Sequence, residues 1–198
     1  FGRVEPDVPC PPANRGIAVA TNAGIDAARS DWVAFHDHDD ALAPHAVDRI
    51  LDALARAPDC MFLYTDEVVA DANLKPEHLF LKPAFDTVLL SGVNYVNHLA
   101  LYRRDRLVAV GGLREGFDGS QDYDLLLRYT RGLGRRECLH LPYPAYLWRR
   151  DGRSFSSVNM SGATQHARSA LAEAYARDGV SPPIGPANDP DLHRIRFD

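Results

Sequence analysis

Two short apolar runs, over residues 32–35 and 60–64, constrain the fold more than any other feature of this chain. Each run has the length and composition of a buried strand. Between them, residues 44–57 carry apolar side chains at helical spacing, and Pro44 occupies a position that starts many helices. A strand, a helix and a second strand make a β-α-β unit, in which the strands are parallel and the crossover is right-handed. The sequence therefore predicts an α/β fold.

Acidic side chains follow both predicted strands. Asp37, Asp39 and Asp40 come directly after the first strand, and Asp66 and Glu67 after the second. Parallel strands end at the same edge of a sheet, and open α/β sheets bind their ligands at that edge. Carboxylates suit Mg²⁺ and Mn²⁺, which keep substrate phosphates as further ligands, and a cation relieves the repulsion among crowded carboxylates. The pattern indicates a metal-assisted site for a phosphate-bearing substrate, although Asp is also common in solvated turns.

Bulk composition narrows the classes of function. The 198 residues suffice for one domain, or for one domain with an appendage. A net charge of −5 argues against nucleic acid and against an anionic membrane as partners. Cys10, Cys60 and Cys138 are far apart and form no CxxC pair, which argues against a disulfide framework or structural zinc and fits a reducing compartment. No apolar stretch reaches the roughly 18 residues of a membrane span, and no signal peptide is visible.

The rest of the chain alternates between helical and strand-like segments. Helices are expected over residues 16–29, 84–92 and 163–178, and strands over 95–103, 137–141 and 143–149. A glycine-rich loop from Gly111 to Gly119 leads to Asp122 and Asp124, which begin another helix. Acids at a helix start are ordinary capping residues, so the pair on its own does not indicate a catalyst.

Several short motifs stand in an order that resembles family 2 glycosyltransferases with the GT-A fold. In chain order they are Asn14-Arg15-Gly16 with Asn22-Ala23-Gly24, Asp37-His38-Asp39-Asp40, Tyr64-Thr65-Asp66-Glu67, Phe80-Leu81-Lys82-Pro83, Asn94-Tyr95, Gly111-Gly112-Leu113-Arg114, Ser120-Gln121-Asp122-Tyr123-Asp124, Tyr146-Leu147-Trp148-Arg149 and Ser154. Each fragment is weak alone. The ordered set, over roughly residues 14–157, is typical of the family's polysaccharide-synthesising members, including rhamnan-synthesis-like ones.

The resemblance implies an α/β fold of the GT-A type, a Rossmann-related mixed sheet flanked by helices. It implies a nucleotide-diphospho-sugar donor, an ion of Mn²⁺ or Mg²⁺ on the diphosphate, and inversion at the anomeric carbon. Asp37 and Asp39 carry over as metal ligands, and His140 as the third. Asp122 carries over as the general base that takes the proton of the attacking sugar hydroxyl.

Further roles follow from the same resemblance. Donor binding is expected from Asp40, Asp66, Lys82 and Arg149. Acceptor binding, to a saccharide or a lipid-linked saccharide, is expected from Gln121, Asp124 and Trp148. The family often carries a His immediately before its Trp-Arg pair, and this chain has Leu147 there.

The resemblance also indicates a segment of a longer polypeptide. The family's first β-α-β unit, which holds the nucleoside, has no counterpart here. We expect an irregular lead-in over residues 1–13, a partial GT-A domain over 14–180, and a linker over 181–198 towards a second glycosyltransferase module. Such machinery faces the cytoplasm, and a peripheral position at the inner face of the membrane is the more specific hypothesis.

Two other functions remain open at the level of sequence. One is a catalytically incomplete module that binds a nucleotide sugar within a larger protein. The other is a phosphatase of the haloacid dehalogenase type with Asp37 as nucleophile, for which the later motifs are missing.

Overall fold

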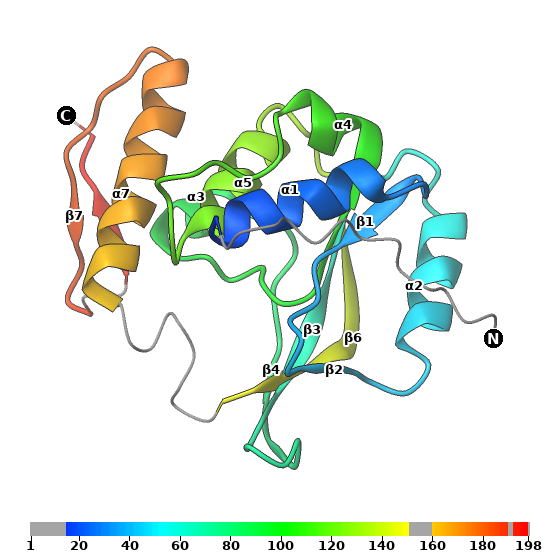
Figure 1. Cartoon of the computed structure of the whole chain (residues 1–198). Coiled ribbons are helices and arrows are strands. Elements are labelled where there is room, and N and C mark those ends of the chain that lie inside the picture. Colours follow the sequence, from blue (N-terminus) through cyan, green and yellow to red (C-terminus); the bar gives the residue numbers. More distant parts are fainter. Residues whose placement is uncertain (1–14, 151–159, 190–191, 198) are drawn as a thin grey trace.

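The computed structural model describes residues 15–150, 160–189 and 192–197. It shows a mixed sheet flanked by helices, which confirms the predicted fold class (Figure 1). The expected lead-in over residues 1–13, Cys10, Asn14 and Ser154 lie outside the described residues.

One mixed sheet forms the centre of the described part of the chain. Its strands are β1 (Trp32–Ala34), β2 (Ala41–Leu42), β3 (Phe62–Ala70), β4 (Pro76–Phe80), β5 (Ala100–Arg103) and β6 (Cys138–Arg149), in the order β1-β5-β3-β6-β2, with β4 paired to β3. Among these described strands, only the β3–β6 pairing is parallel. Because β1 and β3 are each antiparallel to β5, they are parallel to one another, as predicted, with β5 between them.

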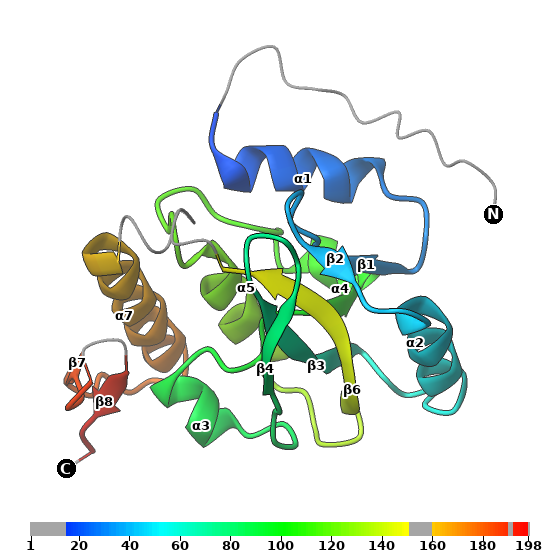
Figure 2. The ribbon, with the colours of Figure 1, turned by 90° about the horizontal axis from the view of Figure 1, so that it is seen from below.

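Helices cover both faces of the sheet (Figures 1 and 2). They are α1 (Ile17–Ala27), α2 (Ala46–Ala55), α3 (Thr87–Gly92), α4 (Arg104–Ala109), α5 (Gln121–Thr130) and α7 (Met160–Arg177). Side chains of a strand point alternately to the two faces. Accordingly, Phe62 and Tyr64 pack in the core that contains α1, α5 and α7, whereas Leu63 packs in the core that contains α2.

Three of the departures from the sequence prediction concern β3, α2 and β6. Strand β3 continues past Tyr64 to Ala70 and is buried throughout, so Asp66 and Glu67 lie within the strand rather than after it. Helix α2 begins at Ala46, two residues after Pro44, because His45 adopts a left-handed conformation with φ of 60°. The two strands expected over 137–149 form the single strand β6, with register shifts opposite residues 65–67.

The C-terminal segment is a short ribbon where the sequence predicts a linker. Strand β7 (Ile184–Pro186) pairs antiparallel with β8 (His193–Ile195). Two ring contacts join this segment to the domain: His193 stacks on Tyr123 at 5.9 Å between ring centroids, and Phe197 meets Tyr175 edge-on at 5.6 Å.

A buried ion network attaches the glycine-rich loop to α5. Asp124, only 1% exposed, accepts hydrogen bonds from the guanidinium groups of Arg114 and Arg128. Arg128 also donates to the carbonyl oxygens of Val110 and Gly112, each at 2.7 Å. Burial alone would raise the pKa of Asp124, but the hydrogen bonds from the two arginines outweigh burial and the pKa is lowered. The carboxylate therefore holds the loop and the first turn of α5 together.

We expect Asp124→Asn to lower the free energy of unfolding by about 3–5 kcal/mol, because it leaves the buried Arg128 without its counter-charge. Asp178→Asn is the matched control: its ion pair with Arg131 is half exposed, at 56% and 49%, and about 0–1 kcal/mol is expected. Chemical denaturation at pH 7 measures both variants. Similar small losses in the two variants would contradict the network.

The stability difference between the wild type and Asp124→Asn should depend on pH. A carboxylate whose pKa is lowered by folding contributes stability above its unfolded pKa of about 3.9 and loses it as the pH falls through the lowered value. The stability difference between the wild type and Asp124→Asn should therefore be constant above about pH 5 and shrink in stronger acid.

Candidate active site

A cavity brings together a carboxylate of the acidic turn after β1 and the carboxylate that was predicted as the base. Asp37, which follows β1, and Asp122, in the first turn of α5, both line it. Between them lie Asn97 and His98, from the segment that precedes β5, and Gln121 lines the cavity beside Asp122. The structure thus places the predicted base and the first predicted metal ligand around one space.

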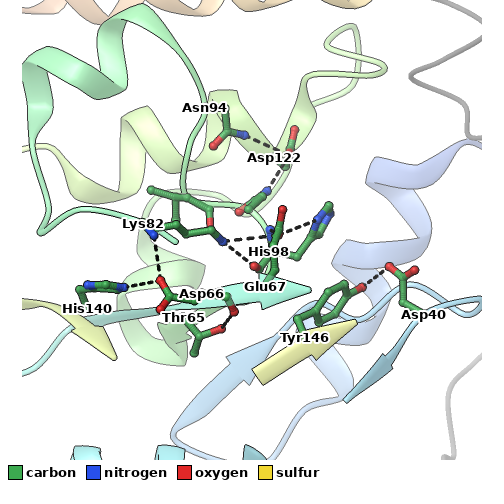
Figure 3. Close-up of polar contacts among 12 residues, drawn as sticks. Asp40, Thr65, Asp66, Glu67, Lys82, Asn94, His98, Asp122, His140 and Tyr146 are labelled. Atoms are coloured by element: carbon green, nitrogen blue, oxygen red, sulfur yellow. Dashed lines mark hydrogen bonds and ion pairs between the residues drawn. The ribbon is translucent and has the colours of Figure 1, made fainter. Parts of the chain in front are cut away.

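The acidic turn is held by β6. The hydroxyl of Tyr146 donates to Asp40 at 2.6 Å and accepts the backbone N–H of Asp37 at 3.1 Å. The backbone N–H of Arg149 donates to the other oxygen of Asp40 at 2.7 Å. Asp40 therefore anchors the turn, while the side chain of Asp39 is 47% exposed and turned to solvent. Figure 3 shows the Tyr146–Asp40 contact at the end of β6.

The electrostatics around Asp37 favour a cation. Desolvation raises its pKa, His98 acts in the opposite direction, and the negative charges of Asp40, Asp39 and Asp122 raise the pKa further. A divalent ion would relieve this repulsion, and the oxygen donors of Asp37 and Asp39 are of the kind that Mg²⁺ and Mn²⁺ accept. The residues present fit such an ion.

The predicted third metal ligand, His140, is placed elsewhere. It lies on β6 opposite Tyr64, with its ring stacked on that tyrosine at 5.0 Å, and its Nε2 is 2.8 Å from the Oδ1 of Asp66. Within the part of the chain that the structure describes, no three His, Cys, Asp or Glu side chains are gathered closely enough to hold an ion. The expected triad of Asp37, Asp39 and His140 is therefore not assembled, because β6 directs His140 to Asp66.

Lys82 and Asp66, both expected to contact the donor, are buried in contacts of their own. The ammonium group of Lys82 donates to the carbonyl oxygens of Val96, at 2.7 Å, and of His98, and lies 3.5 Å from Glu67. Burial lowers the pKa of Lys82 to about 8, against the opposing effect of Glu67. The carboxylate of Asp66 accepts the backbone N–H of Lys82 at 2.8 Å. Lys82 thus holds the segment before β5, and Asp66 holds the backbone of Lys82, a contact that Figure 3 shows.

Asp122 is oriented by three donors. The side-chain amides of Asn94, at 3.2 Å, and of Asn97 donate to its Oδ2, and the backbone N–H of Tyr123 donates to its Oδ1 at 2.8 Å. The buried Oε1 of Gln121 has no hydrogen-bond partner among the described residues, which suits a contact to a ligand hydroxyl.

Three predicted residues remain: Asp124, Trp148 and Arg149. Asp124 is 1% exposed and fully engaged with its arginines, so its position does not fit the expected acceptor contact. Trp148 lies beside the cavity, 5.7 Å from the ring of His98. The buried Nε of Arg149 lacks a partner in the described part of the chain, which leaves a donor for a phosphate.

Sequence reasoning missed Asn97, His98 and the contribution of Glu67. The signal that could have found Asn97 and His98 is an antiparallel strand. Because β5 is antiparallel to β1, its start lies at the edge where β1 ends, so residues before β5 meet residues after β1. The positions of carboxylates in the sequence indicate only where strands end, and not which other segments meet them there.

Relatives of known sequence match most of the chain. O-antigen biosynthesis protein RfbC of Myxococcus xanthus is 40% identical over 187 residues, covering 91% of this chain and 14% of that protein. Uncharacterized protein y4gI of Sinorhizobium fredii is 35% identical over 176 residues, covering 87% of this chain and 19% of that protein. The chain thus spans less than a fifth of the length of these two relatives.

A solved structure shares the fold. Mannosyltransferase PcManGT from Pyrobaculum calidifontis, in complex with GDP-Man and Mn²⁺, superimposes with a TM-score of 0.55 at 19% identity, covering 86% of this chain and 46% of that one. None of the helices in the described part of our chain has the length and apolar character needed to cross a membrane. The profile of Glycosyl transferase family 2 matches residues 11–111, about half of the chain. The chain therefore belongs to glycosyl transferase family 2.

Proposed function

We propose that this chain carries the catalytic centre of a metal-dependent, inverting glycosyltransferase that moves a sugar from a nucleotide-diphospho-sugar to a saccharide hydroxyl. The observation that carries the proposal is the meeting of Asp37 and Asp122 around one cavity, from elements 85 residues apart (122 minus 37). The name of the Myxococcus relative supports O-antigen or related polysaccharide as the product. The mannosyltransferase complex supports a nucleotide-sugar donor and a divalent ion.

Each residue has a role that its surroundings allow. Asp122, fixed by Asn94 and Asn97, accepts the proton of the attacking hydroxyl as that oxygen bonds to the anomeric carbon. Asp37 and Asp39 hold Mn²⁺ or Mg²⁺. When bound, the ion neutralises charge that builds on the departing nucleoside diphosphate. The guanidinium of Arg149 adds a cationic donor near the acidic turn, since the backbone N–H of Arg149 is bonded to Asp40.

Acceptor recognition is assigned to Gln121 and Trp148. Gln121 lines the cavity beside the base and presents an oxygen without a partner among the described residues. Trp148, which meets the ring of His98, offers an aromatic face of the kind on which sugars pack. The acceptor is a saccharide or a lipid-linked saccharide. A cytoplasmic enzyme at the inner face of the membrane would meet such acceptors where nucleotide sugars are made.

The nucleoside is held by a further β-α-β unit of a longer polypeptide, which we place at the open edge of β1. In the described residues β1 ends the strand order and pairs with β5 alone. An unpaired strand edge is a template for another strand. A second glycosyltransferase module on the C-terminal side completes the proposed arrangement.

Asp122→Asn should reduce turnover by about 10²–10⁴-fold while donor affinity stays within about twofold, because the amide cannot accept the proton. Transfer from nucleotide sugars by the full-length protein measures turnover, and calorimetry measures donor affinity. Asp118→Asn, an exposed carboxylate of the same glycine-rich loop, is the control and should leave turnover unchanged. Unchanged turnover in Asp122→Asn would favour a binding module without catalysis.

Mn²⁺ should promote binding of one nucleotide among UDP, GDP and dTDP, and Asp39→Ala should abolish that effect. Calorimetric titration of this chain and of a chain extended at its N-terminus tests both the ion and the missing unit. We expect the extended chain to bind at least about tenfold more tightly, since a ribose and base site is worth more than 1.4 kcal/mol. Equal affinities would exclude a nucleoside site in the extension.

Tyr146→Phe should loosen the acidic turn, because it removes the hydroxyl shared by Asp40 and Asp37. We expect a loss of about 1–3 kcal/mol in stability and a several-fold weaker Mn²⁺-dependent binding of nucleotide. Tyr143→Phe is the control, since its hydroxyl donates to the carbonyl of Pro44 at an exposed position. Equal effects of the two variants on nucleotide binding would argue against the anchoring role.

A further inference from the structure

We propose that an open cavity of about 470 Å³ beside the glycine-rich loop is a second ligand site, and that it binds a phosphate or diphosphate group. We call it the arginine cavity, because its lining residues are Val110 and five arginines, Arg106, Arg114, Arg128, Arg131 and Arg177. It shares no lining residue with the candidate active site. This inference therefore goes beyond the proposed function.

The arginines of this cavity come from separate parts of the fold. Arg106 belongs to α4, Arg128 to α5 and Arg177 to the end of α7, while Arg114 lies in the glycine-rich loop and Arg131 directly follows α5. None of the lining residues is acidic. Cations gathered around one space repel each other, and a cleft lined by one sign of charge concentrates counter-ions. The net charge of the whole chain is −5, so this cluster is a local feature that overall composition does not explain.

Carboxylates behind the cavity wall hold the arginines without neutralising all of them. Three carboxylates pair with the arginines, and none of the three lines the cavity: Asp124, Glu173 and Asp178. Glu173 accepts a hydrogen bond from Nη1 of Arg114 at 2.7 Å and lies 3.6 Å from Nη2 of Arg177. Because five cations face three carboxylates, an excess of positive charge remains at the cavity.

Capping of helix ends explains only some of the arginine donors. Arginines near helix C-termini commonly bond the last carbonyl oxygens, and Arg106 does so at Tyr129 and Arg131, each at 2.7 Å. Arg131 uses its Nε and Nη2 for Asp178 and for the carbonyl oxygen of Arg177. The Nη1 groups of Arg106 and Arg131 have no hydrogen-bond partner among the described residues. Two arginines that line the cavity therefore keep donors for a ligand.

The chemistry of the donors favours phosphate. A guanidinium group donates two parallel N–H bonds to the oxygens of a phosphate or a carboxylate. A carboxylate has only two oxygens and one charge, whereas phosphate and diphosphate present more oxygens, in several directions, and carry more negative charge. Arginines that reach one space from different segments therefore match a phosphate group better than a single carboxylate.

Calorimetric titration of inorganic diphosphate into the whole chain tests the site. The buffer is freed of metal, so that the acidic turn repels anions and the proposed donor site does not contribute. We expect saturable binding that weakens as the salt concentration rises. Arg131→Gln with Arg177→Gln should reduce the affinity at least about tenfold, because charge-assisted hydrogen bonds are among the strongest. Both residues are exposed, so this double variant should fold, which circular dichroism checks.

A matched control has the same change of net charge. Arg135→Gln with Arg136→Gln removes two exposed arginines that do not line the cavity, and it should alter the affinity less than about twofold. Glu173→Gln should bind diphosphate several-fold more tightly, because it removes a carboxylate that competes for Arg114 and Arg177. Arginines that serve only as helix caps predict no such gain.

Vesicles distinguish a free phosphate from a lipid-borne one. Flotation compares phosphatidylcholine vesicles with and without phosphatidic acid. Binding of either diphosphate or phosphatidic acid that is lost in the Arg131→Gln, Arg177→Gln variant supports the proposal and identifies the source of the phosphate.

Three results would overturn the proposal. They are no binding of either phosphate probe by the folded wild type, equal weakening by the two double variants, and no gain in Glu173→Gln. A glutamate-rich peptide that binds where neither phosphate probe does would also overturn it, in favour of an acidic protein segment. None of these results bears on the proposed function, which the turnover of Asp122→Asn and metal-dependent nucleotide binding test separately.

Discussion

The antiparallel pairing of β5 between β1 and β3 is the constraint on which the candidate site depends. β1 and β3 run parallel but are not paired with each other, because β5 lies between them and pairs with both. A strand that runs against its neighbours begins where they end. The segment before β5 therefore reaches the edge at which the acidic turn follows β1, and His98 meets Asp37. A parallel strand in that position would have sent the same residues to the opposite edge.

Two buried ion clusters hold the walls of the cavity in place. Asp124 and its arginines hold the glycine-rich loop against α5, and so present Asp122 at the first turn of that helix. Glu67 and Lys82 hold the segment of Val96 to His98 on the other wall. Buried charge pairs are weak evidence for stability but strongly destabilising when one partner is removed. Their use here is consistent with a site whose geometry must be kept to fractions of an ångström.

The local sequence pattern was sufficient to predict the elements whose apolar residues recur with a strong periodicity. The helices at α1, α2 and α5 and the parallel relation of β1 and β3 follow from apolar spacing and chain order. The pattern could not show that β3 runs on to Ala70, because Asp66 and Glu67 look like the end of a strand until their buried partners are known. Those partners, Lys82 and His140, are 15 or more residues away: Lys82 follows β4, and His140 belongs to β6.

Three residues of the predicted site also have buried partners that the sequence pattern does not show. Lys82, Asp124 and His140 have chemistry that suits a donor, an acceptor and a metal, yet each is committed to a buried charge partner. His98 and Asn97 belong to no charge cluster in the sequence, and only the direction of β5 brings them to the cavity. Prediction from residue type alone therefore assigns too many residues to a functional site when some of them form buried ion pairs.

The charge balance of the cavity then limits how the proposed donor can enter. Four carboxylates make the potential there negative: Asp37, Asp39, Asp40 and Asp122. Desolvation is the main cause of the raised pKa of Asp37, and the charges of the other three carboxylates raise it further. Lys82 offers no compensation, because its ammonium group is held by carbonyl oxygens and Glu67. A diphosphate approaching this edge meets repulsion that Arg149 alone does not cancel. On the proposed function, the ion therefore has to arrive before the nucleotide or together with it.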